Sequence, residues 1–383
     1  MSEQTSGSGA TGVRPGSAFR AALEDLNSGY FALVMGTSIV SIGLHEAGLE
    51  PASRVLLVVA AIAYVMLWIL YIWRAIAYPR AMLRDLRAPG RAFAYFTVVA
   101  GTNVLAVRMF SAGLLGAAVP LVIFAALLWL VIGYVLPWQV FMTRDGEPIL
   151  SRVNGTWFIW AVASQSVAIG MTTIQPVASS GGEWIGLAAV LTWSVGVALY
   201  AGVAVLVMLR IVRFGMTPRE FEPPYWVAMG AMAIAVVAGS GILGMRSTPM
   251  VEATRVLIGG TIAVFWSFCL WLIPMLVGAG LWRHVVHRVP LRYVPALWSM
   301  VFPVGMFAVA SLNLGRVDEL PLVESVGDAV LVLAVLVWAI VFLAMLRSVG
   351  GVLLRSRRGG ISAPAPGRRG PGTPSPGARP ASG

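Results

Sequence analysis

Apolar residues follow one another in long runs along most of the chain. A helix needs about 20 apolar residues to cross a bilayer, and these runs reach that length. Charged residues or Pro and Gly separate ten of them, which begin near Gly29, Arg54, Ala92, Gly113, Asn154, Gly186, Tyr225, Ala253, Val294 and Ser325. The pattern predicts an all-α integral membrane protein with ten transmembrane helices between residues 27 and 349.

The two ends of the chain have a different composition. Residues 1–26 begin with a polar stretch that lacks the basic and apolar regions of a signal peptide, and residues 350–383 are rich in Gly, Pro, Ser and Arg. Such segments cannot bury enough apolar surface to fold. We expect a disordered tail on each side of one transmembrane domain.

Polar residues are concentrated in alternate runs. The first run carries Thr37, Ser38 and Ser41, whose spacing of three and four puts them on one helix face. By contrast, the second run, from Arg54 to Arg74, has no Gly, Ser, Thr, Asn or Gln. The sixth and eighth runs blur this alternation with Thr192, Ser194, Thr261 and Ser267.

This alternation predicts five helical hairpins, with the odd-numbered helices forming an inner ring around a central pore. Small polar residues also serve helix packing in membranes, and for a single helix that reading is the more common one. Their recurrence in alternate runs favours pore lining. The predicted lining residues are Thr37, Ser38, Ser41, Thr102, Asn103, Ser164, Gln165, Ser240, Ser299, Met306 and Asn313.

The distribution of charge indicates the topology. All 27 basic residues apart from histidine are arginines, against 16 acidic residues, which gives a net charge of +11. With the N-terminus in the cytoplasm, 22 arginines fall on that side and 5 on the other. The positive-inside rule therefore predicts that both termini are cytoplasmic, and it accounts for the basicity without a nucleic-acid partner.

Charged groups lie near the ends of the runs. No Asp, Glu, Arg or His lies near the middle of one, which argues against a proton-driven exchanger or a cation channel. The outward ends of four inner helices carry His45, Arg108, Arg246 and Arg316. These four predict a basic outer mouth that favours anions, although arginines also anchor helix ends at the membrane surface.

Catalytic residues are scarce. The chain has one cysteine, three histidines at run ends and no lysine. This composition excludes a disulfide within the chain and a P-loop, and it offers no cluster for a metal. We expect no enzyme activity, no metal and no cofactor. A non-conducting membrane scaffold remains an alternative.

Three segments resemble a known family. They are GYFALVMGTSIVSIG (Gly29 to Gly43), FWSFCLWLIPML (Phe265 to Leu276) and LWSMVFPVGMFAVAS (Leu297 to Ser311). The chain is similar to the tellurite-resistance/dicarboxylate transporter family, which includes slow-type anion channels and malate and sulfite transporters. The resemblance implies five hairpins around a pore and assembly as a homotrimer.

The resemblance also implies a phenylalanine gate in the ninth helix, which falls on Phe302 followed by Pro303. Phe302 lies ten residues beyond Arg292, about 15 Å along a helix at 1.5 Å per residue. That depth would place its ring near the membrane midplane. The alternative is an ordinary core aromatic residue.

The expected function is passive transport of an anion across the plasma membrane. By resemblance, the solutes are small inorganic anions or C4-dicarboxylates such as malate. The alternative is efflux of sulfite or tellurite oxyanions, with or without coupling to protons. The expected partners are a small anionic solute, the lipid bilayer and further copies of the chain.

Overall fold

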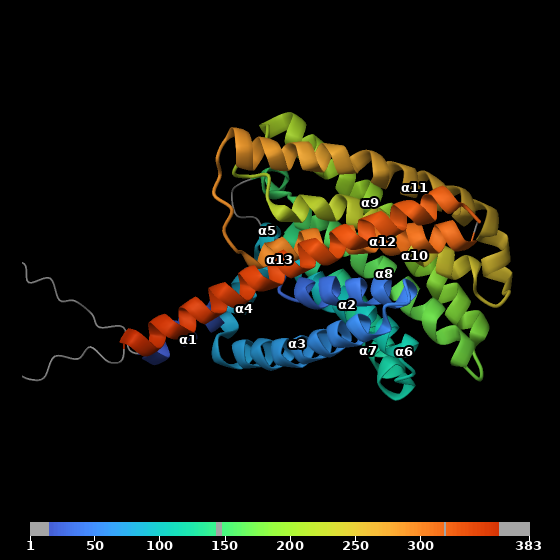
Figure 1. Ribbon diagram of the computed structural model, residues 1–383, viewed down its shortest axis with the longest axis horizontal. Helices are drawn as coiled ribbons and strands as arrows, with labels where there is room; N and C mark the ends of the chain where they lie inside the picture. Colours follow the sequence, from blue (N-terminus) through green and yellow to red (C-terminus); the bar gives the residue numbers. More distant parts are fainter. Residues whose placement is uncertain (1–14, 143–147, 318, 360–383) are drawn as a thin grey trace, which may run out of the picture.

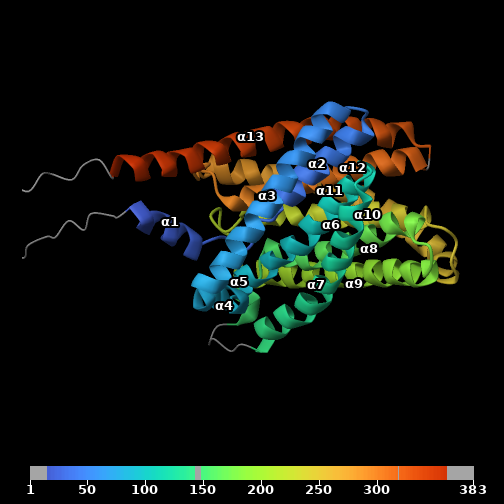
Figure 2. The ribbon, with the colours of Figure 1, turned by 90° about the horizontal axis from the view of Figure 1, so that it is seen from below.

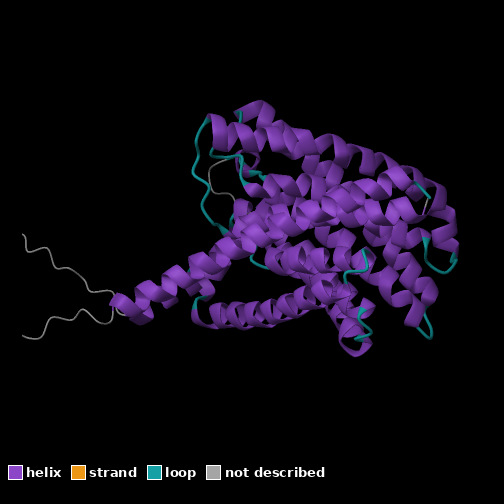
Figure 3. Cartoon of the chain, in the orientation of Figure 1, coloured by secondary structure: helices purple, strands orange, loops and turns teal. Residues whose placement is uncertain are grey.

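The computed structural model describes residues 15–142, 148–317 and 319–359. Every regular element in these residues is helical, and none is a strand (Figure 3). The all-α prediction is therefore confirmed. Five arginines that entered the charge count lie outside the described residues: Arg14, Arg144, Arg368, Arg369 and Arg379.

Ten of the described α-helices, all except α1 (Pro15–Glu24), α4 (Pro79–Arg87) and α5 (Pro89–Ala92), fall into two length classes. The shorter ones are α2 (Ala32–Glu46), α6 (Thr97–Ser111), α8 (Phe158–Ile174), α10 (Val227–Leu243) and α12 (Trp298–Val317). Each is followed by a longer one: α3 (Glu50–Ala77), α7 (Leu115–Met142), α9 (Gly182–Phe214), α11 (Pro249–Leu281) and α13 (Pro321–Gly359). These ten elements begin within a few residues of the predicted runs.

Nine helical segments in the described ranges are long and apolar enough to cross a membrane. The shorter α2, with 15 residues, is apolar but falls below that length. A multi-pass membrane protein is thus supported by length and composition. Ten crossings around a central pore remain a prediction.

The five shorter helices form a closed cycle of contacts, which we call the ring. Around it, α2 packs on α6, α6 on α8, α8 on α10, α10 on α12, and α12 on α2. The longer helices, which we call the outer helices, each pack on the ring helix that precedes them in the chain. Each also contacts the next ring helix, so that it covers the seam between two neighbours (Figures 1 and 2).

All five ring helices begin at the same end, which we call the amino end of the ring. Four of them follow a 3₁₀ turn: η1 (Phe93–Phe96), η3 (Gly155–Trp157), η5 (Pro223–Trp226) and η7 (Pro295–Leu297). Consecutive turns in this series contact one another. The ring helices therefore run parallel, and the described chain ends also lie at this end (Figure 1).

Glycine permits close contact at every seam of the ring. A Cβ atom added at these glycines would lie 2.8–3.2 Å from an atom of the neighbouring ring helix. The five contacts join Gly36 to Val301, Gly101 to Phe31, Gly170 to Asn103, Gly230 to Pro303, and Gly241 to Thr172. Small residues let membrane helices approach this closely.

The segment before the first ring helix is partly ordered. Residues Pro15–Glu24, predicted to belong to a disordered tail, form the helix α1, in which Leu23 is buried. Arg74 of α3 donates hydrogen bonds to the carbonyl of Glu24 through Nε and Nη2. A buried arginine thus fixes the end of α1, a long-range contact that local composition does not indicate.

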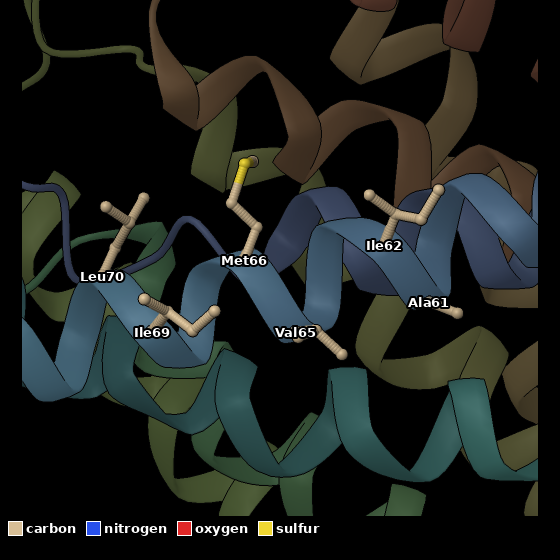
Figure 4. Close-up of a pocket in the computed structure, with 6 residues that line it drawn as sticks. All are labelled: Ala61, Ile62, Val65, Met66, Ile69 and Leu70. Carbon is tan, nitrogen blue, oxygen red and sulfur yellow. The ribbon is translucent and has the colours of Figure 1, made fainter.

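The outer helices present apolar side chains to their surroundings. A groove of about 520 Å³ lies on α3 and is lined by Ala61, Ile62, Val65, Met66, Ile69 and Leu70 (Figure 4). A lining without polar groups suits hydrocarbon chains better than an anionic solute. The candidate site must therefore be sought inside the ring.

Candidate functional site

The ring helices share a common register. Each begins next to a large apolar or aromatic pair, whose second members are Phe31, Phe96, Phe158, Trp226 and Trp298. We number each of these five residues as position 0 and count along the chain. Residues with the same position number then lie at comparable heights on the five parallel helices. This register allows side chains of different helices to be compared directly.

Position 6 of the register faces the outer helices. Three of its residues carry hydroxyl groups, and each makes a hydrogen bond to an outer helix. The bonds join Thr37 Oγ1 to Trp338 Nε1 (3.0 Å), Thr102 Oγ1 to the Tyr64 hydroxyl (3.2 Å), and Ser164 Oγ to the Thr192 carbonyl (2.9 Å). These hydroxyls hold the two layers of helices together.

Position 4 lies on the opposite side of each helix. Two residues of separation correspond to about 200° of rotation at 3.6 residues per turn. The residues at this position are Met35, Ala100, Val162, Gly230 and Phe302, and all five are buried. Because position 6 points outward, position 4 points away from the outer helices: Met35 lies against Gly101 of α6 and Gly230 against Pro303 of α12. Phe302 is the only aromatic member of this layer.

Phe302 lies nearer to the helix start than the sequence suggested. The chain from Val289 to Val294 is not helical, since Arg288 has a positive φ and Pro295 opens a 3₁₀ turn. Helix α12 begins at Trp298, so that Phe302 lies four residues, or about 6 Å, into it. The depth of 15 Å from Arg292 was wrong, because it assumed a continuous helix.

The neighbours of Phe302 on α12 differ in their surroundings. Pro303 packs against Gly230 of α10, where an added Cβ would lie 2.8 Å from Pro303 Cγ. The ring of Phe307 stacks on Trp266 of the outer helix α11, with 6.2 Å between centroids. Phe307 therefore faces the outer layer, whereas Phe302, five residues earlier and about 140° away around the helix, points elsewhere.

Several buried polar atoms of the ring have no hydrogen-bond partner in the described part of the chain. They are Ser38 Oγ, Asn103 Oδ1, Gln165 Oε1, Ser240 Oγ, Glu46 Oε2 and Arg108 Nη1. The first three share position 7, so that they lie at a similar height on α2, α6 and α8. A buried polar atom without a partner costs about 1–3 kcal/mol, which water or a polar solute would remove.

The amide nitrogens at position 7 hold the two amide side chains in place. Asn103 Nδ2 donates to Ser166 Oγ of α8 at 3.1 Å, and Gln165 Nε2 donates to the Trp193 carbonyl of α9 at 3.0 Å. Each amide is thus anchored through nitrogen. The oxygen atoms remain available to a donor.

The remaining predicted lining residues belong to α12. Ser299 and Met306 are buried, and Asn313 is half-buried. Pro303 has no N–H group, so the Ser299 carbonyl four residues earlier loses its helical donor. Met306 stands one turn after Phe302, on the same side of the helix.

Arg108 is fully buried near the carboxyl end of the ring, where the ring helices finish. Its Nε donates to Ser53 Oγ at 2.9 Å and to Ser41 Oγ at 3.2 Å. Its Nη2 forms an ion pair with Glu50 Oε1 at 3.2 Å. The charge predicted for the outer mouth is therefore engaged between α2, α3 and α6.

The other members of the predicted basic mouth also have partners. His45 Nδ1 lies 2.5 Å from Glu50, and Arg316 Nε lies 2.9 Å from Glu324. Arg246 is exposed and donates to the Pro176 carbonyl at 2.8 Å. Three of the four basic groups therefore face a carboxylate, which leaves less free positive charge than the sequence suggested.

Comparison with known proteins places this architecture. A family model described as voltage-dependent anion channel (SLAC1) matches residues 25–346. The chain belongs to this family. The match covers the ring and the outer helices, and it confirms the resemblance to tellurite-resistance/dicarboxylate transporters.

Relatives of the chain carry general names. An uncharacterized membrane protein of Mycobacterium tuberculosis is 49% identical over 160 residues, which are 42% of this chain and 81% of the relative. Two uncharacterized transporters of Methanocaldococcus jannaschii are 21% and 22% identical over 345 and 333 residues. These alignments cover 85% and 81% of this chain, and 96% and 90% of the relatives.

Membership of the SLAC1 family gives a class of function: transport or conduction of anions across a membrane. Within the described residues, no group of three or more His, Cys, Asp or Glu side chains could hold a metal ion. The partners Glu50, Ser53, Tyr64 and Trp338 were missed by the sequence reasoning, because the first two lie between predicted runs and the last two lie in runs assigned to the outer layer. Glu50, in the first turn of α3, is the one that sequence could have indicated, since it directly follows the first ring helix.

Proposed function

We propose that the chain forms a passive pathway for small anions through the ring, closed at rest by the side chain of Phe302. Small inorganic anions and C4-dicarboxylates such as malate are the proposed solutes. The proposal includes a plasma-membrane location, cytoplasmic termini and a homotrimer, which rest on the arginine distribution and the family resemblance. Thr37, Ser41, Thr102, Ser164 and Gln165 have partners in the outer layer, so the proposed lining centres on position 4 and on Ser38 and Asn103 of position 7.

The observation that carries the proposal is the arrangement of the ring interior. At position 7 of the neighbouring helices α2 and α6, Ser38 Oγ and Asn103 Oδ1 are buried without partners in the described chain, and the aromatic Phe302 stands at position 4, about one turn closer to the amino end. Hydroxyl and amide groups can replace part of the hydration of a passing ion. A bulky apolar side chain in a narrow passage excludes water, and with it the ion.

The fixed charges favour anions mainly at the amino end. The ring interior near positions 4 and 7 has no arginine, so it selects weakly among anions of similar size. The arginine count on the side of the termini instead raises the local anion concentration. We therefore propose a broad anion preference and no single tightly bound substrate.

Proton-coupled oxyanion efflux is the second candidate, and one residue favours it. Glu46 is the last residue of α2, and its Oε2 is buried with no hydrogen-bond partner in the described chain. A carboxyl group in that setting can exchange a proton during transport. Sulfite and tellurite are the proposed oxyanions for this mechanism.

Purified protein in liposomes tests both candidates. Anion flux is measured for chloride, nitrate, malate and sulfite at several membrane potentials, with and without a proton gradient. Passive conduction predicts electrogenic flux that follows the electrochemical gradient and ignores the proton gradient. Flux that requires a proton gradient, and is lost in Glu46→Gln, would instead support coupled efflux. If no anion is transported, the remaining alternative is a non-conducting membrane scaffold.

A further inference from the structure

The short helix α4 (Pro79–Arg87) lies outside the ring and carries three exposed arginines. It lies between α3 and the ring helix α6, and it packs on α7. Arg80, Arg84 and Arg87 are exposed and recur at steps of four and three, so they form one stripe. Ala81 and Asp85, on another side, are buried. We call these three arginines the α4 stripe.

The acidic residue of α4 does not neutralise the stripe. Asp85 points into the protein, where it accepts hydrogen bonds from Arg74 Nη2 at 2.6 Å and Arg91 Nη1 at 3.0 Å. Across the described ranges, no carboxylate forms an ion pair with a side chain of the stripe. Three positive charges therefore stand together on a surface without an internal counter-charge.

The surroundings of the stripe place it at the edge of the apolar surface. The last turns of α3 expose Ile69, Ile72, Trp73 and Ile76, immediately before α4 begins. Tryptophan is typical of the boundary between hydrocarbon and headgroups. Leu83 is exposed beside the stripe, which gives α4 both a charged and an apolar contact. A short amphipathic helix of this kind lies along a membrane surface.

We propose that the α4 stripe binds the phosphate groups of anionic phospholipids, with α4 lying along the membrane surface. Arginine pairs with phosphate through several N–H donors in a planar fork. Continuity with the exposed face of α3 favours a lipid over a soluble phosphate compound, because acyl chains can cover Ile76 and Leu83 while the headgroup meets the arginines. The inference is independent of the proposed anion pathway.

The test uses the full-length protein in detergent, with bound lipid counted by native mass spectrometry. Phosphatidylglycerol and phosphatidylcholine are supplied at equal concentration, and the ratio of their binding is compared among variants. The variant Arg80→Gln/Arg84→Gln/Arg87→Gln removes the stripe. The control, Arg213→Gln/Arg219→Gln/Arg292→Gln, removes three other exposed arginines from the same end of the protein.

A basic residue near an anionic surface changes binding by about fivefold. The triple stripe variant should therefore lower the phosphatidylglycerol preference by more than about tenfold, while the control stays within about twofold. Arg80→Lys/Arg84→Lys/Arg87→Lys keeps the charge and should retain most of the preference. Because it changes the same three positions, a retained preference would show that the glutamine variant loses lipid through its missing charge and not through misfolding.

Three outcomes would overturn the proposal. Equal losses in the stripe and control variants would indicate a general charge effect. An unchanged preference in the stripe variant would place the lipid elsewhere. Displacement of phosphatidylglycerol by an equal concentration of soluble glycerol phosphate would show a site for free phosphate compounds.

Discussion

The ring and the outer helices are both apolar, but the outer helices are the more apolar of the two sets, with mean hydropathies of 2.2–3.1 against 1.3–2.0 for the four longer ring segments. In the most apolar window of each segment, 72–83% of residues are buried in the four longer ring segments, against 17–39% in the outer helices. In α2, every residue from Ala32 to Leu44 is buried. Hydropathy therefore identifies helices that are compatible with lipid, and polar content identifies those that lipid does not reach.

Glycine has a different meaning in the two layers. At each seam of the ring, a glycine lies against a neighbouring helix. On the outer helices, Gly133 of α7 and Gly278 of α11 have nothing within 4 Å of an added Cβ. Other outer glycines are packed, such as Gly196 of α9 against Gln165 and Gly327 of α13 against Leu312. Glycine thus marks a close contact at every seam of the ring but only at some positions of the outer helices, a contrast that substitutions can test.

The largest expected effect is on stability at the amino end of the ring. An added Cβ at Gly155 would lie 2.4 Å from backbone atoms of Pro224 and Tyr225. Because backbone cannot move aside as a side chain does, Gly155→Ala should cost at least about 3 kcal/mol of unfolding free energy. Gly133→Ala is the matched control and should leave stability unchanged or slightly higher. Thermal unfolding in detergent, followed by size-exclusion chromatography, compares them. Equal melting temperatures would contradict the packing described for this end.

A second effect concerns flux and compares two buried phenylalanines of one helix. Phe302→Ala should raise anion flux severalfold, since it removes the ring proposed to close the pathway. Phe307→Ala should lower protein yield without raising flux, because its ring packs on Trp266 and a truncated core phenylalanine costs about 3–5 kcal/mol. Liposomes at matched protein density give the measurement. Phe302→Leu should fall between wild type and Phe302→Ala, and a rise in flux for Phe307→Ala alone would reverse the assignment.

A smaller effect on the free energy of unfolding is expected when a hydrogen bond between the ring and the outer helices is removed. Thr37→Val and Trp338→Phe should each lower the free energy of unfolding by about 0.6 kcal/mol, the average for such bonds in membranes. The double variant should lose about as much as either single one, since both remove the same bond. Ser267→Ala, on the exposed side of α11, serves as the control. Additive losses would show that the two side chains act separately.

The smallest expected effect concerns the carboxyl end. Arg246→Gln should lower flux by less than about twofold at low salt and have no effect at high salt, because exposed charges are screened within about 8 Å at physiological ionic strength. Flux measured at two chloride concentrations checks this. A large loss that persists at high salt would point to the hydrogen bond with Pro176 as a structural contact.

Much of the fold could be predicted from the sequence, because helices that face lipid are almost purely apolar, whereas helices enclosed by protein also carry polar residues. The runs located the helices, and the polar residues separated the ring from the outer layer. The direction of each side chain was harder to predict. Thr37 has a hydroxyl and Met35 does not, yet Thr37 bonds outward to Trp338 while Met35 lies against Gly101 of the neighbouring ring helix. Hydropathy counts tryptophan as apolar, so it conceals the donor that draws the hydroxyl outward.

The charges of the candidate site were also only partly predictable. Arg108 was identified at a helix end, but its partner Glu50 lies between the first two runs and meets it only after folding. The start of α12 depended on the backbone around Arg288 and Pro295, which a count of residues cannot show. Contacts between distant segments and breaks in helices are the features that a single sequence specifies least directly.

The parallel order of the ring helices has an electrical consequence. Each helix carries about half a positive elementary charge at its start and about half a negative one at its finish. Five helices that run the same way add these partial charges, whereas antiparallel neighbours would cancel them. The backbone alone therefore makes the two ends of the ring unequal, and it would do so even in a chain whose arginines were all replaced. On the proposed pathway, an ion would meet a built-in field, and current in the two directions would not be equivalent.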